Sequence, residues 1–162
     1  MYTVQVKIAD LAVLKEQGML ITYGLGSCVG IALYESTSKI AGLAHILLND
    51  STKFIKPGVN NYNPAKFADT AIPVLLHRMI ELGAHKGEVI AKIVGGASLF
   101  NFQSASGGIG EKNVEAVRSK LAELNVPLHA AEVGGNYGRT MKLLAETGAV
   151  VITRAGKGAM TL

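Results

Sequence analysis

Residues 29–48 read VGIALYESTSKIAGLAHILL and hold two apolar runs separated by a short polar segment. The runs cover residues 29–34 and 40–48, and residues 35–38 between them are polar. Apolar runs joined by so few polar residues are typical of a β-hairpin. The centre of the predicted fold is therefore a pair of antiparallel strands.

Signals for further strands and for two helices surround this hairpin. Apolar or alternating runs predict strands at residues 3–8, 19–24, 88–94, 128–133, 141–144 and 149–153. Helical spacing of apolar residues predicts one helix at residues 64–82, and Gly110 opens a second helix. Residues 49–63 show neither period and are predicted to form a surface loop. This order predicts a single α+β domain over residues 1–162, with mostly antiparallel strands and two main helices on one face.

The composition excludes several classes of function. The chain has 162 residues, a net charge of +4 and one cysteine, so neither an internal disulfide nor a cysteine zinc cluster can form. Lysine and arginine are scattered, which argues against a nucleic-acid-binding protein. There is no apolar run long enough to span a membrane and no signal-peptide pattern, so a cytoplasmic protein that does not insert into lipid is expected. No metal site is expected either, because no two histidines have ligand spacing on one element.

Residues 23–30 read YGLGSCVG and place several glycines around the only cysteine. Their spacing resembles a dinucleotide-binding loop, but such a loop needs the N-terminus of a helix, and the residues that follow predict a strand. Nucleotide binding is therefore rejected. Small residues beside the thiol would instead leave room for a substrate and free backbone N–H groups for an oxyanion, and the residues concerned are Gly26, Ser27 and Gly30.

Cys28 and His45 form a candidate nucleophile and base. If residues 35–38 form the hairpin turn, the register places Cys28 directly opposite His45. A neighbouring imidazolium lowers the pKa of a thiol, and the imidazole can then protonate a leaving group. Thr22 is the nearest polar side chain in the preceding run that could orient the imidazole. The alternative is structural for all three: a small core thiol, a half-buried strand histidine and a β-branched strand residue.

Six separate stretches, in the right order, resemble the CheD family of chemoreceptor glutamine deamidases, and the likeness covers nearly the whole chain. The stretches are TYGLGSCVGIALY (22–34), IAGLAHILL (40–48), KFADTAI (66–72), KIVGGASLF (92–100), IGEKNV (109–114) and GGNYGR (134–139). Six matches in order are much more specific than any single motif.

The resemblance implies a layered α/β/β sandwich and a cysteine hydrolase that converts receptor glutamine side chains into glutamate. Its triad would correspond to Cys28, His45 and Thr22, and no cofactor is implied. The cytoplasmic domains of chemoreceptors would be the substrate, and a CheC phosphatase, which CheD binds and stimulates, would be a second partner. Phe100 and Arg139 are candidate contacts for a partner or the substrate, although each also fits a structural role.

Two other functions are compatible with the same residues. The chain could act mainly as a non-catalytic regulatory binding partner of the CheC phosphatase. The thiol and imidazole would also permit an unrelated cysteine peptidase or amidase, but the six matching stretches argue against it.

Overall fold

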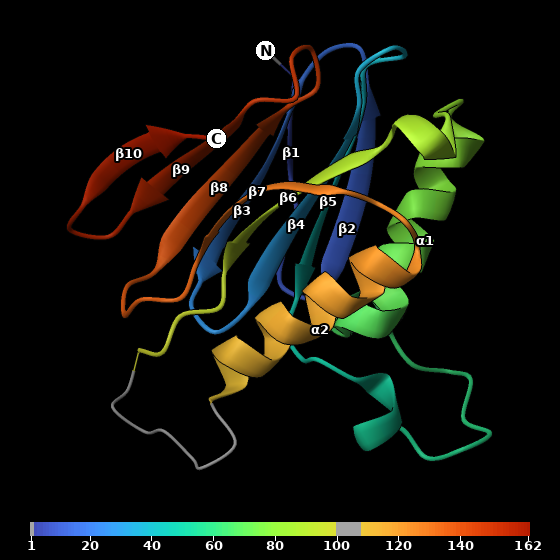
Figure 1. Cartoon of the computed structure of the whole chain (residues 1–162), viewed down its shortest axis with the longest axis vertical. Helices are drawn as coiled ribbons and strands as arrows, with labels where there is room; N and C mark the ends of the chain where they lie inside the picture. The colour runs from blue at the N-terminus through green and yellow to red at the C-terminus, as the bar shows by residue number, and fades with distance from the viewer. Residues whose placement is uncertain (1, 100–107) are drawn as a thin grey trace.

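The computed structural model of the chain describes residues 2–99 and 108–162, which form two five-stranded sheets and two α-helices (Figure 1). The outer sheet contains, in spatial order, β1 (Thr3–Gln5), β3 (Met19–Leu25), β8 (Arg139–Leu144), β9 (Val150–Arg154) and β10 (Gly158–Thr161). The central sheet contains, in spatial order, β2 (Asp10–Lys15), β5 (Ile40–Ile46), β4 (Val29–Glu35), β6 (Ile90–Gly95) and β7 (Leu128–Val133). The helices are α1 (Ala68–Glu81) and α2 (Ile109–Glu123), and the 3₁₀ turns are η1 (Ser51–Lys53), η2 (Pro64–Lys66) and η3 (Lys86–Glu88).

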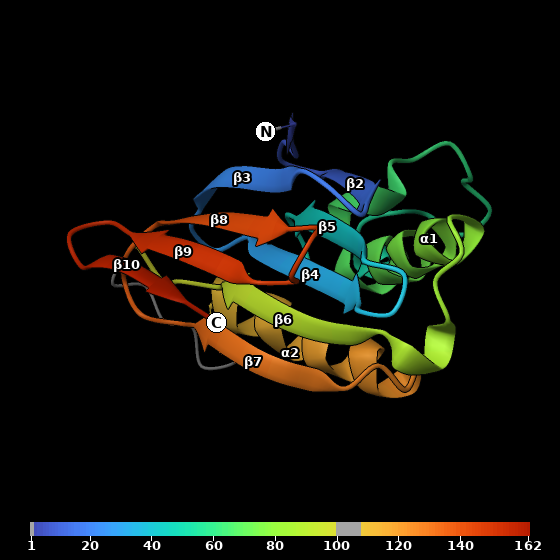
Figure 2. The ribbon, with the colours of Figure 1, turned by 90° about the horizontal axis from the view of Figure 1, so that it is seen from above.

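The elements stack as three layers: the outer sheet, the central sheet and the helices (Figure 2). Alternate side chains of β4 belong to two different cores. Ile31 packs in one core with Leu75 of α1 and Val117 of α2, whereas Ala32 packs in the other with Leu143 of the outer sheet. This arrangement confirms the predicted α+β class and the α/β/β order of the layers.

The strands at the centre of the molecule are buried on both faces. Every residue of β4 and β5 is buried, which explains why their sequences are continuous apolar runs without polar alternation. The strand pairs β1–β3 and β6–β7 are parallel, and the other paired strands in the described residues are antiparallel. The expectation of mostly antiparallel strands is therefore confirmed.

The register of the central hairpin differs from the predicted one. Gly30 pairs with His45, and residues 36–39 form the turn, in which Lys39 has a φ of 53°. The prediction that Cys28 lies directly opposite His45 is therefore wrong. Cys28 and Gly30 are two positions apart and share one side of the strand, so the thiol lies diagonal to the imidazole on the same face.

Both helices cover the face of the central sheet that is turned away from the outer sheet (Figures 1 and 2). The first helix begins at Ala68 and not at Pro64, because Phe67 has extended backbone angles that interrupt it after η2. Asn63 caps η2 by accepting a hydrogen bond from the Ala65 N–H. Within residues 2–99 and 108–162, neither helix is long and apolar enough to cross a membrane.

Candidate functional site

Thr22 and His45 connect the two sheets at a fully buried position. Thr22 belongs to β3 of the outer sheet, His45 belongs to β5 of the central sheet, and neither side chain is exposed to solvent. Thr22 Oγ1 lies 2.6 Å from His45 Nδ1, which is a hydrogen-bonding distance. The fold thus brings together two residues that lie far apart in the sequence and that the sequence analysis had grouped.

The backbone of Val6 determines which ring nitrogen of His45 carries the hydrogen. The Thr22 hydroxyl donates its single hydrogen to the Val6 carbonyl oxygen at 2.7 Å. Thr22 can then only accept from His45, so Nδ1 is the protonated nitrogen and Nε2 keeps a free lone pair. Nε2 is buried and has no hydrogen-bond partner among the described residues. The sequence analysis missed Val6, because it acts through its carbonyl and no side-chain pattern signals that.

Cys28 lies immediately before β4 and faces the space between the two sheets. Its side chain packs in the same core as Leu25 and Met141, and the residue is 6% exposed. Because His45 pairs with Gly30, Cys28 occupies the diagonal position, roughly 7 to 8 Å away between Cα atoms. The thiol therefore lies on the same face of the sheet as His45, and no hydrogen bond joins it to Nε2.

Burial sets the protonation states of the thiol and the imidazole. Desolvation lowers the pKa of His45 to about 4, so its imidazole is neutral at pH 7. Desolvation also raises the pKa of Cys28, an effect that a hydrogen bond from its own backbone N–H partly offsets. The resting pair is therefore a neutral thiol beside a neutral imidazole, which differs from the thiolate and imidazolium expected from the sequence.

Two glycines at the end of β6 shape the backbone around Cys28. The Gly96 N–H donates to the Cys28 carbonyl oxygen at 2.8 Å, and the Ala97 N–H donates to the Gly26 carbonyl oxygen at the same distance. Gly95 and Gly96 have φ values of 119° and 64°, so the chain turns away from β4 here. In the described residues no backbone carbonyl accepts from the Cys28 N–H. This N–H instead faces the sulfur of its own residue.

Gly26, Ser27 and Gly30 have three different surroundings. A Cβ at Gly26 would lie 2.9 Å from Cδ1 of Leu99, and a Cβ at Gly30 would lie 2.6 Å from Sδ of Met141. Gly30 therefore allows the outer sheet to approach the hairpin. Ser27 lines a cavity beside residues 26–28, the segment between β3 and β4 that carries Cys28 and is called the thiol loop below.

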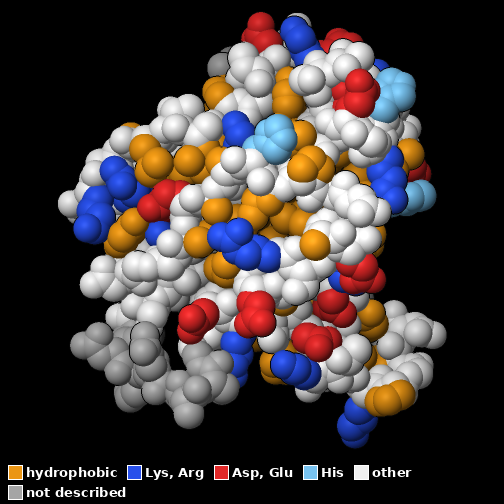
Figure 3. All heavy atoms as spheres, viewed as in Figure 1, with side chains coloured by type: hydrophobic (Ala, Val, Ile, Leu, Met, Phe, Trp, Pro, Cys, Tyr) orange, Lys and Arg blue, Asp and Glu red, His pale blue; other side chains and the backbone are white. Residues whose placement is uncertain are grey.

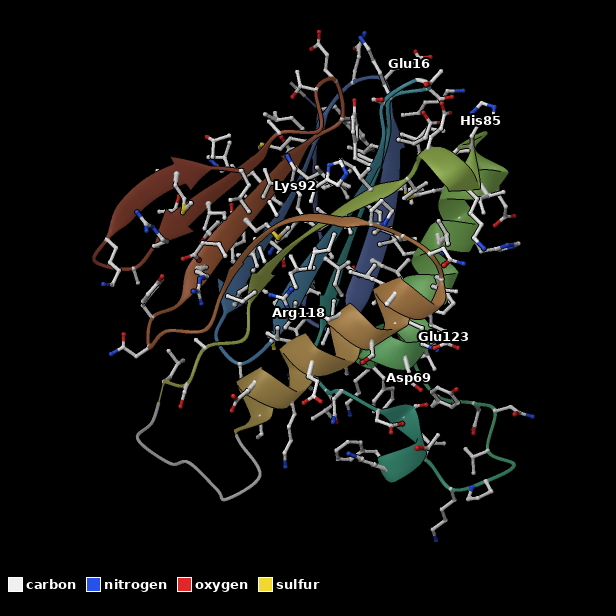
Figure 4. The ribbon with its side chains drawn as sticks, viewed as in Figure 1. Glu16, Asp69, His85, Lys92, Arg118 and Glu123 are labelled. Carbon is white, nitrogen blue, oxygen red and sulfur yellow. The ribbon has the colours of Figure 1, made fainter. Side chains whose placement is uncertain are left out.

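That cavity has a volume of about 880 Å³ and lies between the thiol loop, the end of β6 and the first turns of α2. Leu99 and Ile109 line it, and 49% and 60% of their respective surfaces are exposed. Arg118 lines it from α2, where Figure 4 shows its position. Figure 3 shows acidic and basic side chains intermixed on the face that α2 exposes. The cavity therefore offers a substrate both apolar and charged contacts beside Ser27.

Arg139 occupies a structural position between the sheets. It is 2% exposed, forms an ion pair with Glu132 through Nε, and donates to the Gly95 carbonyl oxygen through Nη1 at 3.4 Å. The ring of Tyr137 packs against its guanidinium, with 4.3 Å between Cζ and the ring centroid. Arg139 thus supports the Gly95 turn from within. Phe100, the other predicted contact, lies outside the described residues.

Three side chains away from the thiol could coordinate a metal ion. The nearest ligand atoms of Glu35, His85 and Glu88 all lie within 4.8 Å of one another, and Figure 4 shows His85 far from the first turn of α2. Burial disfavours the charge on Glu35, but backbone N–H groups of Ser38 and His85 donate to its carboxylate and bring its pKa down to about 2. Both carboxylate oxygens are therefore already engaged in holding the β4–β5 turn and the segment before η3.

Comparison with known proteins identifies the family of the chain. A family model described as CheD chemotactic sensory transduction matches residues 36–154. A protein of Clostridium botulinum strain Hall, named probable chemoreceptor glutamine deamidase CheD, is 52% identical over 157 residues, which cover 96% of this chain and 94% of the relative. A protein of the same name from strain Alaska E43 is 49% identical over 161 residues, covering 98% of this chain and 97% of the relative. With a family model over most of its length and relatives of this identity, the chain belongs to the CheD family.

Proposed function

We propose that this protein hydrolyses the side-chain amide of glutamine residues in chemoreceptors and converts them into glutamate. The names of its relatives support this substrate. The observation that carries the proposal is the hydrogen-bond chain from Val6 through Thr22 to His45, which leaves Nε2 unprotonated on the face of the sheet that also carries the only thiol. A bare imidazole nitrogen next to a cysteine is the arrangement that nucleophilic catalysis requires.

Cys28 supplies the nucleophile in this mechanism. Its sulfur attacks the amide carbon of glutamine while the thiol hydrogen passes to Nε2 of His45, because both groups start in their neutral forms. His45 then gives this proton to the departing nitrogen, ammonia leaves and a thioester remains. Water attacks the thioester and gives a proton to His45, which returns it to the sulfur as glutamate is released.

Backbone groups would stabilise the negative charge that develops on the amide oxygen. The Cys28 N–H has no backbone acceptor in the described residues, and it already points toward its own sulfur. Such a preorganised donor is worth more in a water-poor site than in bulk solvent. In the proposal, Ser27 lines the cavity through which a substrate reaches this N–H, and Gly26 leaves room for the side chain of Leu99.

The proposal is tested by incubating the protein with cytoplasmic fragments of chemoreceptors and mapping glutamine-to-glutamate conversion by peptide mass spectrometry. We expect conversion at particular glutamines, and we expect it to stop when one equivalent of iodoacetamide has alkylated the single cysteine. Conversion that continues after complete alkylation, or no conversion with any receptor fragment, would contradict the proposal.

We propose in addition that the protein acts in the cytoplasm and binds a CheC-type phosphatase, as the family resemblance implies. Binding and catalysis are separable, because Cys28 is almost fully buried and contributes little to any docking surface. A Cys28→Ala variant should therefore bind the phosphatase as tightly as the wild type. If the wild type binds the phosphatase but converts no receptor glutamine, regulatory binding is the main function instead.

A further inference from the structure

We propose that Asn113 is a positioning residue that holds the backbone of the thiol site in place. Asn113 lies on α2 and is 1% exposed, so its carboxamide is directed into the protein. It acts through backbone atoms and does not touch the substrate. The inference rests on the cysteine chemistry proposed above.

The carboxamide of Asn113 bridges the two strands of the central hairpin at the point where their pairing ends. Its Nδ2 donates to the carbonyl oxygen of Ser27 at 2.9 Å and to that of Leu47 at 3.1 Å. The last pair of the β4–β5 ladder is Val29 with Ile46, so both carbonyls lie just beyond it. One side chain therefore provides the hydrogen bonds that the ladder no longer supplies.

This bridge fixes the peptide that precedes the nucleophile. In a trans peptide the C=O and the following N–H point in opposite directions, so holding the Ser27 carbonyl also orients the Cys28 N–H. On the other side, the Cys28 carbonyl accepts from the Gly96 N–H. The backbone of Cys28 is thus held by α2 through Asn113 and by the end of β6 through Gly96. The hydrogen bond from Asn113 Nδ2 to the Leu47 carbonyl oxygen holds the chain directly after β5, the strand that carries His45.

The chemistry of the amide group suits this task. Its NH₂ group offers two hydrogens to two carbonyls and brings no charge into a buried site. Its Oδ1 is buried and has no partner among the described residues, which is unfavourable for folding. An apolar side chain of similar volume would avoid that penalty, but it would leave the Ser27 and Leu47 carbonyl oxygens without this donor.

The close approach of α2 makes the bridge geometrically feasible. A Cβ at Gly110 would lie 2.5 Å from the Ala97 carbonyl oxygen and 2.6 Å from that of Gly96. The first turn of α2 therefore lies directly against the backbone that follows β6. Asn113, one turn further on, is brought within reach of the thiol loop.

The test compares Asn113→Leu and Asn113→Ala with Val117→Ala, a matched control that alters the next turn of the same buried face. Steady-state kinetics on a receptor fragment should show kcat reduced about tenfold to a hundredfold in both Asn113 variants, with KM nearly unchanged, because a small misplacement of reacting groups affects chemistry and not docking. Val117→Ala should lower stability but keep the wild-type kcat per folded molecule.

A second measurement needs no substrate. Iodoacetamide should alkylate Cys28 several-fold faster in native Asn113→Leu than in the wild type, after correction for the globally unfolded fraction, because the Ser27 peptide is released. Absence of conversion by the wild type would reject the proposed function, and the alkylation rates would still decide the role of Asn113. Wild-type values of both kcat and alkylation rate in a folded Asn113 variant would overturn the inference.

Discussion

At the level of single residues, the hydrogen bonds around His45 have a fixed direction. The Val6 carbonyl can only accept, so the Thr22 hydroxyl must donate to it and must accept from Nδ1. The contribution of Thr22 is therefore an acceptor oxygen at a defined place. A serine retains that oxygen, whereas a valine keeps the shape of threonine and loses it.

Replacing Thr22 tests this directionality. We expect Thr22→Val to lower the kcat of deamidation by about a hundredfold, the scale on which positioned acid–base groups act, because the tautomer of His45 is no longer fixed. Thr22→Ser should retain most of the activity. The measurement is steady-state conversion of a receptor glutamine, and equal activity of the Val and Ser variants would refute the role of the hydroxyl.

The depressed pKa of His45 predicts a pH dependence of stability. The unfolded chain, in which histidine has a pKa near 6.5, binds this proton more tightly than the folded chain, in which the value is about 4. Stability should therefore be full above pH 6.5 and should fall by up to about 3 kcal/mol as the pH drops to 4. The lowered pKa of Glu35 acts in a separate window, below pH 4.5.

Urea unfolding between pH 7 and pH 4.5 measures this effect. His45→Gln should flatten the pH dependence in that window. His77→Gln, a change at an exposed histidine of α1, is the matched control and should leave the dependence as in the wild type. A pH dependence that survives the loss of His45 would show that another group is responsible.

At the level of elements, the approach of α2 to the end of β6 determines how well the thiol loop is held. Gly110→Ala should destabilise the protein by about 1–3 kcal/mol, because its Cβ would overlap backbone atoms of Gly96 and Ala97 that cannot move aside easily. Gly87→Ala in η3 is the control, since a Cβ there meets nothing within 4 Å. Denaturant unfolding of the two variants checks the prediction, which fails if they are equally stable.

The strands show how much of this fold could be predicted from the sequence. The strands β4 and β5 were predictable because their apolar runs are bounded by polar residues, and β7 was predicted with its observed bounds. The register of the hairpin was not predictable, because nothing in the sequence shows that Lys39 adopts a positive φ and extends the turn. β2 and β10 were missed since the first is half-exposed with polar ends and the second is short and exposed.

The candidate site was predictable only in its side chains. Residue types and motifs select Cys28, His45 and Thr22 as candidates, and their catalytic roles stay a prediction. The backbone acceptor Val6 and the bridge from Asn113 depend on contacts between distant segments, which no local pattern encodes.

At the level of the whole molecule, polar side chains join the two sheets at several places besides the site. Tyr34 donates through its hydroxyl to the Ala145 carbonyl oxygen at 2.9 Å, and Lys92 donates to the Leu162 carbonyl oxygen at 2.8 Å (Figure 4). Tyr34 lies near the end of β4 opposite to Cys28. The contact that Tyr34 makes between the sheets is therefore spatially separate from the groups that arrange the thiol.

This separation predicts that stability and activity respond to different changes. Tyr34→Phe should lower the free energy of unfolding by about 1–2 kcal/mol, because the buried Ala145 carbonyl loses its donor. The kcat of the folded variant should equal that of the wild type. Thermal unfolding combined with deamidation kinetics checks both parts, and a large loss of kcat would show that the sheet packing and the site are coupled.

The central claim is that glutamine conversion depends on the Cys28 thiol, and the most direct measurement is the conversion rate of receptor glutamines by folded Cys28→Ala. We predict a rate equal to that of receptor incubated in buffer alone, while the variant keeps the unfolding profile of the wild type. Conversion by this variant at a rate clearly above the buffer rate would contradict the account.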